Sequence, residues 1–262
     1  MTRRIITLTT DFGNSDHFVG TMKGVILTIQ PAAHIVDITH DVPPFDVQQG
    51  AFVIAQAYRY FPKKTIHVVV VDPGVGSTRR PLLVEMSGQF FVAPDNGVLS
   101  MIFAREKAKV RHIANDRYFL HPVSRTFHGR DVFAPSAAHL AAGITPGQFG
   151  PRIEDYLRLT FDQPVPAGKK VWMGAVLSVD RFGNIITNFH MDAFPQVKTR
   201  AFELKLGTRK ITRLALTFTE CEPGELFALV GSSGFLEVAI KEGSAAKLLG
   251  CGSGAPVRLS TY

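Results

Sequence analysis

The sequence is poor in cysteine and contains no long apolar run. Only 2 of its 262 residues are cysteines, and Cys221 and Cys251 lack the spacing of a metal site. Such sparse use of cysteine is typical of a reducing compartment, so we expect a cytoplasmic protein. Because no run of about 20 apolar residues occurs, we expect no membrane span. The first residues also lack the apolar core and cleavage site of a secretory signal.

Basic residues exceed acidic ones, but they do not form a cluster. The formal net charge is +7, from 29 Lys and Arg against 22 Asp and Glu. A basic balance can indicate a nucleic-acid partner. Here the basic residues occur singly or in pairs, without a basic run interleaved with aromatics. We therefore expect a solvated surface, with neither nucleic acid nor membrane as a partner.

Residues 1–150 alternate strand and helix patterns. Apolar, β-branched runs such as residues 5–11 and 66–71 predict strands, the second of them covered on both faces. Apolar residues recur every three or four positions over residues 18–29, which predicts a helix. Two short apolar runs around Ser87-Gly88 predict a hairpin. This alternation is typical of a layered, Rossmann-like α/β domain.

The pattern changes after residue 150. Four prolines lie between residues 146 and 166, where hydrophobic periodicity is weak, so residues 151–170 are predicted to be a linker. Residues 171–262 show short strand patterns separated by Gly-containing turns. This second domain is predicted to be a small all-β barrel or sandwich.

Polar residues follow the predicted strands of the first domain. Asp11, Asp41 and Asp72 each stand at or just after a strand end, and ligands of open α/β sheets bind beyond the carboxyl ends of the strands. Gly74-Val75-Gly76 is not a phosphate loop, because Arg79 occupies the place of the third glycine and no Gly-Lys-Ser/Thr follows. A tight turn can instead bring Asp72 and Arg79 together as a charge-assisted pair.

Seven short motifs occur in order along nearly the whole chain. They are Thr10-Asp11-Phe12-Gly13, Pro44-Phe45-Asp46-Val47, Val71-Asp72-Pro73-Gly74-Val75-Gly76, Ala93-Pro94-Asp95-Asn96-Gly97, Phe127-His128-Gly129-Arg130-Asp131, Asp180-Arg181-Phe182-Gly183-Asn184 and Gly231-Ser232-Ser233-Gly234. Each motif alone is weak, but the ordered set is specific. It resembles the S-adenosyl-L-methionine (SAM) hydroxide adenosyltransferases, relatives of the fluorinases and chlorinases.

The resemblance implies a catalytic group in the first domain. Asp72, Arg79 and His128 match the family's side chains that hold a water or hydroxide. Asp11 matches the carboxylate that binds both ribose hydroxyls. Phe45 stands where the halogenating relatives carry a Trp against the substrate.

The resemblance also implies substrate-binding residues in the second domain. Asp180 matches the carboxylate that binds the methionine ammonium. Phe182 and Asn184 match residues that pack against adenine. Ser232 matches the serine that binds the methionine carboxylate, and Ser233 lies beside it.

The implied activity is that of a SAM hydrolase. Water or hydroxide attacks the ribose 5′-carbon and gives adenosine and L-methionine, without a cofactor or metal. Arg79 and a protonated His128 are expected to favour the hydroxide form of a bound water. Asp72 favours hydroxide over halide, because the halogenating relatives place an uncharged residue there. The resemblance further implies a homotrimer, with each site between the first domain of one subunit and the second domain of its neighbour.

Two other functions remain open from the residues alone. One is a metal-dependent nucleotidase or phosphatase, because Asp11, Asp16, His17, His40 and Asp41 combine oxygen and imidazole ligands. The other is a sensor that binds SAM or adenosine without turnover.

Overall fold

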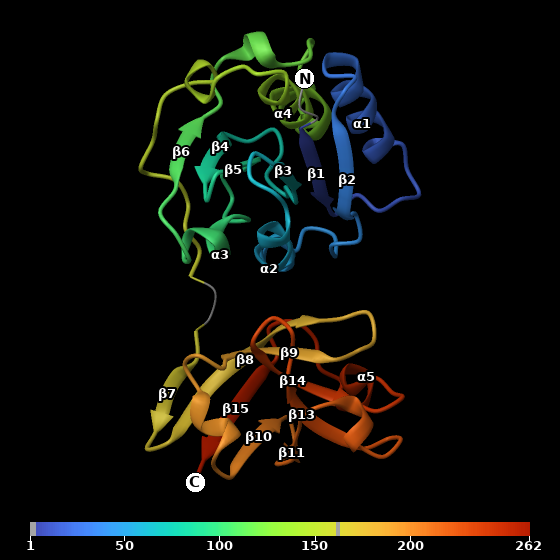
Figure 1. The fold of residues 1–262 in the computed structure, drawn as a ribbon, viewed down its shortest axis with the longest axis vertical. Coiled ribbons are helices and arrows are strands. Elements are labelled where there is room, and N and C mark those ends of the chain that lie inside the picture. Colours follow the sequence, from blue (N-terminus) through green and yellow to red (C-terminus); the bar gives the residue numbers. More distant parts are fainter. Residues whose placement is uncertain (1–3, 161–162) are drawn as a thin grey trace. The chain divides into compact units, whose positions relative to one another are not determined.

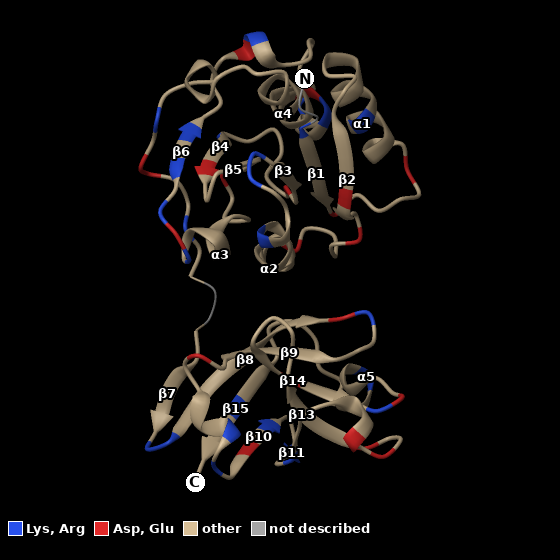
Figure 2. Ribbon diagram, viewed as in Figure 1, with Lys and Arg blue, Asp and Glu red and all other residues tan. Residues whose placement is uncertain are grey.

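The chain forms two compact units, each with its own sheet. The computed structural model describes residues 4–160 and 163–262; residues 1–3, and residues 161–162 of the predicted linker, lie outside the described part. The units are Met1–Leu159 and Thr160–Tyr262, and Figure 1 shows a layered first unit and a β-rich second one. Figure 2 shows Lys and Arg spread over both units, with acidic residues among them. Within the described residues, no helix has the length and apolarity that a bilayer crossing requires.

A six-stranded, mostly parallel sheet forms the centre of the first unit. Its order is β2-β1-β3-β5-β4-β6, and β4 runs antiparallel to both of its neighbours. The strands are β1 (Ile5–Thr10), β2 (His34–Thr39), β3 (Ile66–Val70), β4 (Pro81–Met86), β5 (Gln89–Pro94) and β6 (Lys109–His112). Every residue of β3 is buried, which explains its unbroken apolar run. The predicted hairpin around Ser87-Gly88 is confirmed as β4–β5.

Helices cover both faces of this sheet (Figure 1). On one face, α1 (Phe18–Ile29) and α4 (Ala134–Ala141) share a core with alternate residues of β1 and β3. On the other face, α2 (Val47–Ala57) and α3 (Ser100–Phe103) pack over the remaining residues of β3. The Asp46 side chain caps α2 by accepting from the Gln49 N–H at 2.9 Å. The layered α/β domain is therefore confirmed.

Residues 151–159, which the sequence places in the linker, pack onto the first unit. The Ile153 N–H donates to the Val110 carbonyl at 3.0 Å, and Tyr156 is buried in the core beneath α3. An extended segment held by individual contacts has no repeating apolar spacing, so the sequence pattern does not reveal it.

The second unit is built around one antiparallel sheet, with a parallel pair at one edge. The order β11-β10-β15-β8-β9-β14-β13-β12 holds eight strands, and β7 pairs with β8. The strands are β7 (Val165–Gly168), β8 (Val171–Val179), β9 (Ile185–His190), β10 (Phe202–Leu206), β11 (Arg209–Ile211), β12 (Leu214–Ala215), β13 (Leu226–Val230), β14 (Phe235–Ile240) and β15 (Pro256–Thr261). One short helix, α5 (Ala245–Leu249), follows β14. The predominantly β second domain is confirmed.

Candidate active site

Three side chains predicted to be catalytic lie together in the first unit. Arg79 Nε donates to Asp72 Oδ1 at 2.9 Å, and Arg79 Nη2 contacts Asp72 Oδ2, which makes the pair bidentate. The same Nη2 donates to His128 Nδ1 at 2.8 Å. The side chains of Arg79 and Asp72 are only 8% and 5% exposed. The remaining guanidinium nitrogen, Nη1, is buried and has no hydrogen-bond partner among the described residues.

The chain between β3 and β4 folds so that its two ends meet. The Val75 N–H donates to the Asp72 carbonyl at 3.2 Å, and the Ser77 N–H donates to the Gly74 carbonyl at 3.1 Å, which turns the chain twice. Gly76 has φ of +80°, and a Cβ there would overlap the carbonyl oxygen of Arg125. This close approach brings the segment that leads to His128 against the loop.

His128 is a neutral ring in this arrangement. Burial lowers its pKa, and the charge of Arg79 lowers it further. A guanidinium can only donate, so Nδ1 must accept and the proton lies on Nε2. Burial and the adjacent Arg79 charge thus favour a neutral His128 over the protonated ring expected from the sequence.

Asp11 follows β1 and is held by the chain at Phe45. Its Oδ2 accepts from the Phe45 N–H at 2.9 Å. Burial raises the pKa of Asp11, the Phe45 N–H opposes this, and the charge of Asp72 adds to it. Because β1 and β3 are parallel neighbours, Asp11 and Asp72, which follow the carboxyl ends of these strands, share one edge of the sheet. The Phe45 ring is 72% exposed in this structure.

His40 has a supporting role that the sequence did not reveal. Its Nδ1 lies 2.8 Å from Thr10 Oγ1, and the Gly13 N–H donates to its carbonyl at 2.8 Å. These contacts hold the turn that carries Asp11. His40 Nε2 lies 3.1 Å from Asp37 Oδ1. In the described parts of the chain, no three His, Cys, Asp or Glu side chains are grouped as metal ligands.

Asp180, Phe182 and Asn184 form a tight corner between β8 and β9. Asp180 Oδ1 accepts from the N–H groups of Phe182 and Asn184 at 2.9 and 2.8 Å, and its Oδ2 accepts from Asn184 Nδ2 at 2.8 Å. Phe182 is 78% exposed, whereas Asn184 is buried. Both residues line a cavity of about 560 Å³ together with Phe218 and Ile240, a size that suits a small ligand.

Ser232 and Ser233 form the turn between β13 and β14. The Gly234 N–H donates to the Gly231 carbonyl at 2.9 Å, which closes the turn and leaves Ser232 exposed. The carboxylate of Glu237 lies against Gly231, in the space that a side chain there would fill. Burial raises the pKa of Glu237 to about 7, and the charge of Asp180 contributes.

Sequence reasoning missed Glu237, although a signal was present. Alternate residues of β14, Leu236 and Val238, enter the core, so Glu237 must face the other side of the sheet. This signal is weak, because the same alternation occurs in any strand that has one solvated face.

Comparison with known proteins identifies a family whose two domains match this chain. Residues 6–150 match the SAM hydroxide adenosyltransferase N-terminal domain, and residues 174–258 match the corresponding C-terminal domain. The chain is 37% identical to the (R)-S-adenosyl-L-methionine hydrolase of Salinispora arenicola, over 97% of each sequence. It is 28% identical to the fluorinase of an Actinoplanes species, over 71% of this chain and 72% of that one.

A solved structure has the same fold. The crystal structure of an uncharacterized conserved protein from Thermotoga maritima superimposes with a TM-score of 0.91 at 37% identity. It covers 97% of this chain and 99% of that one. The two domain matches together span most of the sequence. The chain therefore belongs to the SAM hydroxide adenosyltransferase family.

Proposed function

We propose that this protein is a cytoplasmic SAM hydrolase in which water or hydroxide attacks the ribose 5′-carbon and releases adenosine and L-methionine. The observation that carries the proposal is the buried Arg79 Nη1, a donor without an acceptor among the described residues. Buried donors are rarely left unpaired. A hydroxide or polarised water beside the Asp72–Arg79 pair satisfies this donor and supplies the nucleophile.

Cleavage of SAM depends more on the position of the oxygen nucleophile than on a strong base, because the sulfonium is already a good leaving group. An oxygen–carbon bond forms as the carbon–sulfur bond breaks, and the bonding electron pair stays on the methionine sulfur. When water rather than hydroxide attacks, its second proton passes to the Asp72 carboxylate and from there to solvent. Arg79 stabilises the negative charge of the hydroxide, and Asp72 accepts a hydrogen bond from it. Neutral His128 holds Arg79 in place through Nδ1. Alignment with the carbon–sulfur bond contributes several kcal/mol to lowering the barrier.

The adenosine part of the substrate is assigned to complementary groups. Asp11 accepts hydrogen bonds from both ribose hydroxyls, because one carboxylate can serve a diol. Adenine occupies the cavity beside Phe182 and Asn184. Since Asn184 Nδ2 is engaged by Asp180, its Oδ1 is the atom that accepts from the adenine amino group.

The amino-acid part is assigned to the two corners of the second unit. Asp180 binds the methionine ammonium, and the neighbouring Glu237 adds negative charge when ionised. Ser232 and Ser233 donate to the methionine carboxylate. Burial and the charge of Asp180 both raise the pKa of Glu237, and a bound cation would offset the repulsion between the two carboxylates.

The proposal includes the homotrimer that the family resemblance implies, in which one substrate reaches residues of both units. Asp11 of one subunit and Asp180 of its neighbour then bind the same SAM molecule. No metal or cofactor takes part in this scheme.

A turnover assay distinguishes a SAM hydrolase from a sensor that binds SAM without cleaving it. The purified protein is incubated with SAM, and adenosine and methionine are separated by chromatography. Equal amounts of both products, formed over many turnovers, are expected. Tight SAM binding without product would instead support the sensor.

A further inference from the structure

The loop that carries Asp72 and Arg79 is held at both ends by the turn that follows β5. This turn, Asp95-Asn96-Gly97, is one of the seven sequence motifs, and no role in binding or catalysis is assigned to it. The loop leaves β3 at Val71 and enters β4 after Arg80. Asn96 contacts the first of these residues, and Asp95 contacts the second.

Asn96 fixes the start of the loop. Its Nδ2 donates to the carbonyl of Val71 at 2.7 Å, and its Oδ1 accepts from the Val98 N–H at 3.1 Å. Val71 is completely buried and directly precedes Asp72. The hydrogen bond from Asn96 therefore holds the backbone that positions the Asp72 carboxylate. The Val98 N–H in turn fixes the orientation of the Asn96 side chain.

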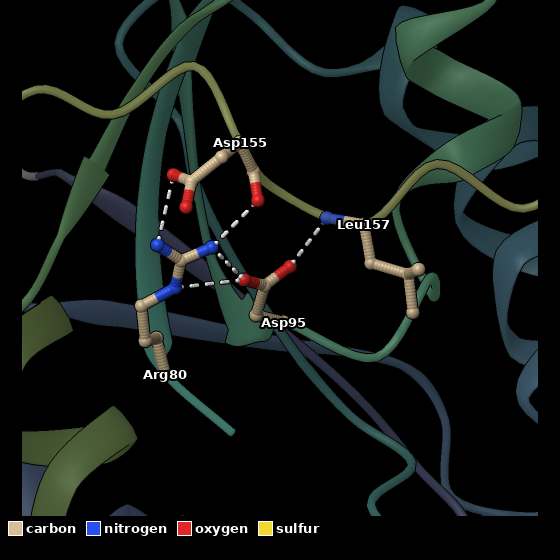
Figure 3. Close-up of polar contacts among 4 residues, drawn as sticks. All are labelled: Arg80, Asp95, Asp155 and Leu157. Atoms are coloured by element: carbon tan, nitrogen blue, oxygen red, sulfur yellow. Dashed lines mark hydrogen bonds and ion pairs between the residues drawn. The ribbon is translucent and has the colours of Figure 1, made fainter. Parts of the chain in front are cut away.

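Asp95 fixes the end of the loop. Its N–H donates to the Arg80 carbonyl at 2.8 Å, and its Oδ2 accepts from Arg80 Nε and Nη2 at 3.0 and 2.8 Å (Figure 3). The Asp95 side chain is only 7% exposed. Arg80, which directly follows Arg79, is thus held through both its backbone and its side chain.

Asp95 and Asn96 thus form a clamp on the two ends of the loop. The chain at residues 155–159 binds this clamp as well. Asp95 Oδ1 accepts from the Leu157 N–H at 2.8 Å, and Arg80 Nη1 donates to Asp155 Oδ1 at 2.9 Å (Figure 3). Gly97 has φ of +93°, and a Cβ there would overlap the side chain of Leu159. The turn is therefore packed directly against residues 155–159, with no room for a side chain at position 97.

We infer that Asp95 and Asn96 are positioning residues that keep Asp72 and Arg79 in their bidentate geometry during turnover. This inference rests on the proposed function of that pair. Two adjacent residues hold the backbone next to each catalytic side chain, so a shift of the turn moves both ends of the loop together. Displacement of a catalytic group by about 1 Å can reduce the rate about 100-fold.

Asn96→Ala tests the inference, with Asn115→Ala as the matched control. Asn115 makes the same pair of bonds elsewhere in the first unit: its Nδ2 donates to the Gln148 carbonyl at 2.9 Å, and its Oδ1 accepts from the Arg117 N–H at 3.3 Å. We expect Asn96→Ala to lower kcat by about 10- to 100-fold with less than about a twofold change in the Kd for adenosine. Asn115→Ala should keep the wild-type kcat.

Equal kcat values for the two variants would overturn the inference. If Asn96→Ala does not fold, Asp95→Asn replaces it, because that change keeps the side-chain size while it removes the charge that holds Arg80 and one of the two acceptor oxygens. An Asp95→Asn protein with wild-type kcat would likewise overturn the inference.

NMR titration of His128 gives a readout that needs no turnover. In the wild type, the adjacent Arg79 helps to lower the pKa of His128. Loosening the loop should raise that pKa in Asn96→Ala and leave it unchanged in Asn115→Ala. A wild-type protein that forms no adenosine refutes the proposed function, whereas an unchanged His128 titration in Asn96→Ala refutes the clamp.

Discussion

At the scale of single residues, Arg79 joins the two other members of the candidate active site. It donates to Asp72 through two nitrogens and to His128 through one of these. Burial lowers the pKa of His128, and the charge of Arg79 lowers it further. The ring of Phe133 lies under the guanidinium, with the Arg79 Cζ 5.3 Å from the ring centroid, so cation–π contact limits its movement as well.

Arg79→Lys should therefore reduce kcat strongly, by about 100-fold or more, because a lysine cannot form the planar, bidentate contact. Arg213→Lys is the control, since Arg213 pairs with Glu225 at an exposed position of the second unit. Steady-state kinetics of both variants check this. A kcat for Arg79→Lys within about twofold of wild type would remove Arg79 from the catalytic group.

The lowered pKa of the buried His67 should make the free energy of unfolding depend on pH. Burial lowers its pKa from 6.5 to about 4, and it stacks on Phe91 with ring centroids 4.9 Å apart. Between pH 6.5 and 4 the unfolded chain binds a proton that the folded His67 does not. The free energy of unfolding should therefore fall as pH falls through this range, by about 3 kcal/mol from this group.

Urea unfolding of wild type and His67→Asn between pH 4 and 7 measures this effect. The variant should lose most of the pH dependence assigned to His67, whereas His34→Asn, at an exposed position of β2, should keep it. Parallel pH curves for wild type and His67→Asn would contradict the assignment.

At the scale of elements, the loop between β3 and β4 needs a glycine at position 76, because the segment before His128 approaches its backbone there. Gly76→Ala places a methyl group against the Arg125 carbonyl at a positive φ. Gly143 has φ of +106° and open space around it. Gly143→Ala is therefore the control, because it introduces backbone strain without a steric overlap. Gly76→Ala should lower stability by about 1–3 kcal/mol more than the control, and should lower kcat by displacing the chain before His128.

Denaturant unfolding and kcat for both glycine variants check this. Equal losses of stability, together with an unchanged kcat in Gly76→Ala, would show that the approach of Arg125 does not shape the site.

The elements that the sequence predicted well are those with a repeating pattern. The buried run of β3 and the helical spacing of α1 are long enough to be distinguished from loops. The strands β11 and β12 were missed because they contain only three and two residues. Residues 151–159 were assigned to the linker because their contacts are individual hydrogen bonds, which leave no periodic pattern.

The candidate site was predictable only where its contacts are local in the sequence. The Gly-rich turn indicated that Asp72 and Arg79 can meet, but the neutral state of His128 depends on burial and on a neighbour 49 residues away. The clamp by Asp95 and Asn96 was not predictable from spacing, because it requires the order of β3, β5 and β4 in the sheet. The roles of the substrate-binding residues remain predictions from the family resemblance.

At the scale of the whole molecule, the proposed trimer predicts complementation between subunits. Asp11→Asn and Asp180→Asn change residues in different units and keep an acceptor for their backbone partners. Each variant alone should be impaired. A trimer that contains both variants has one site with both aspartates intact, so its activity should be roughly one third of wild type.

Coexpression of the two variants with different tags, followed by two affinity steps, isolates the mixed assembly. Sedimentation should give three times the chain mass of 28.7 kDa. A mixed assembly no more active than the separate variants would contradict a site shared between subunits.

The central claim is that the oxygen of water becomes the 5′-hydroxyl oxygen of adenosine. The direct test is incubation of the protein with SAM in ¹⁸O-labelled water, followed by mass spectrometry of the adenosine. We expect one labelled oxygen per adenosine, located on the ribose 5′-carbon, and methionine without label. Adenosine without label, or label at another position, would contradict attack by water on that carbon.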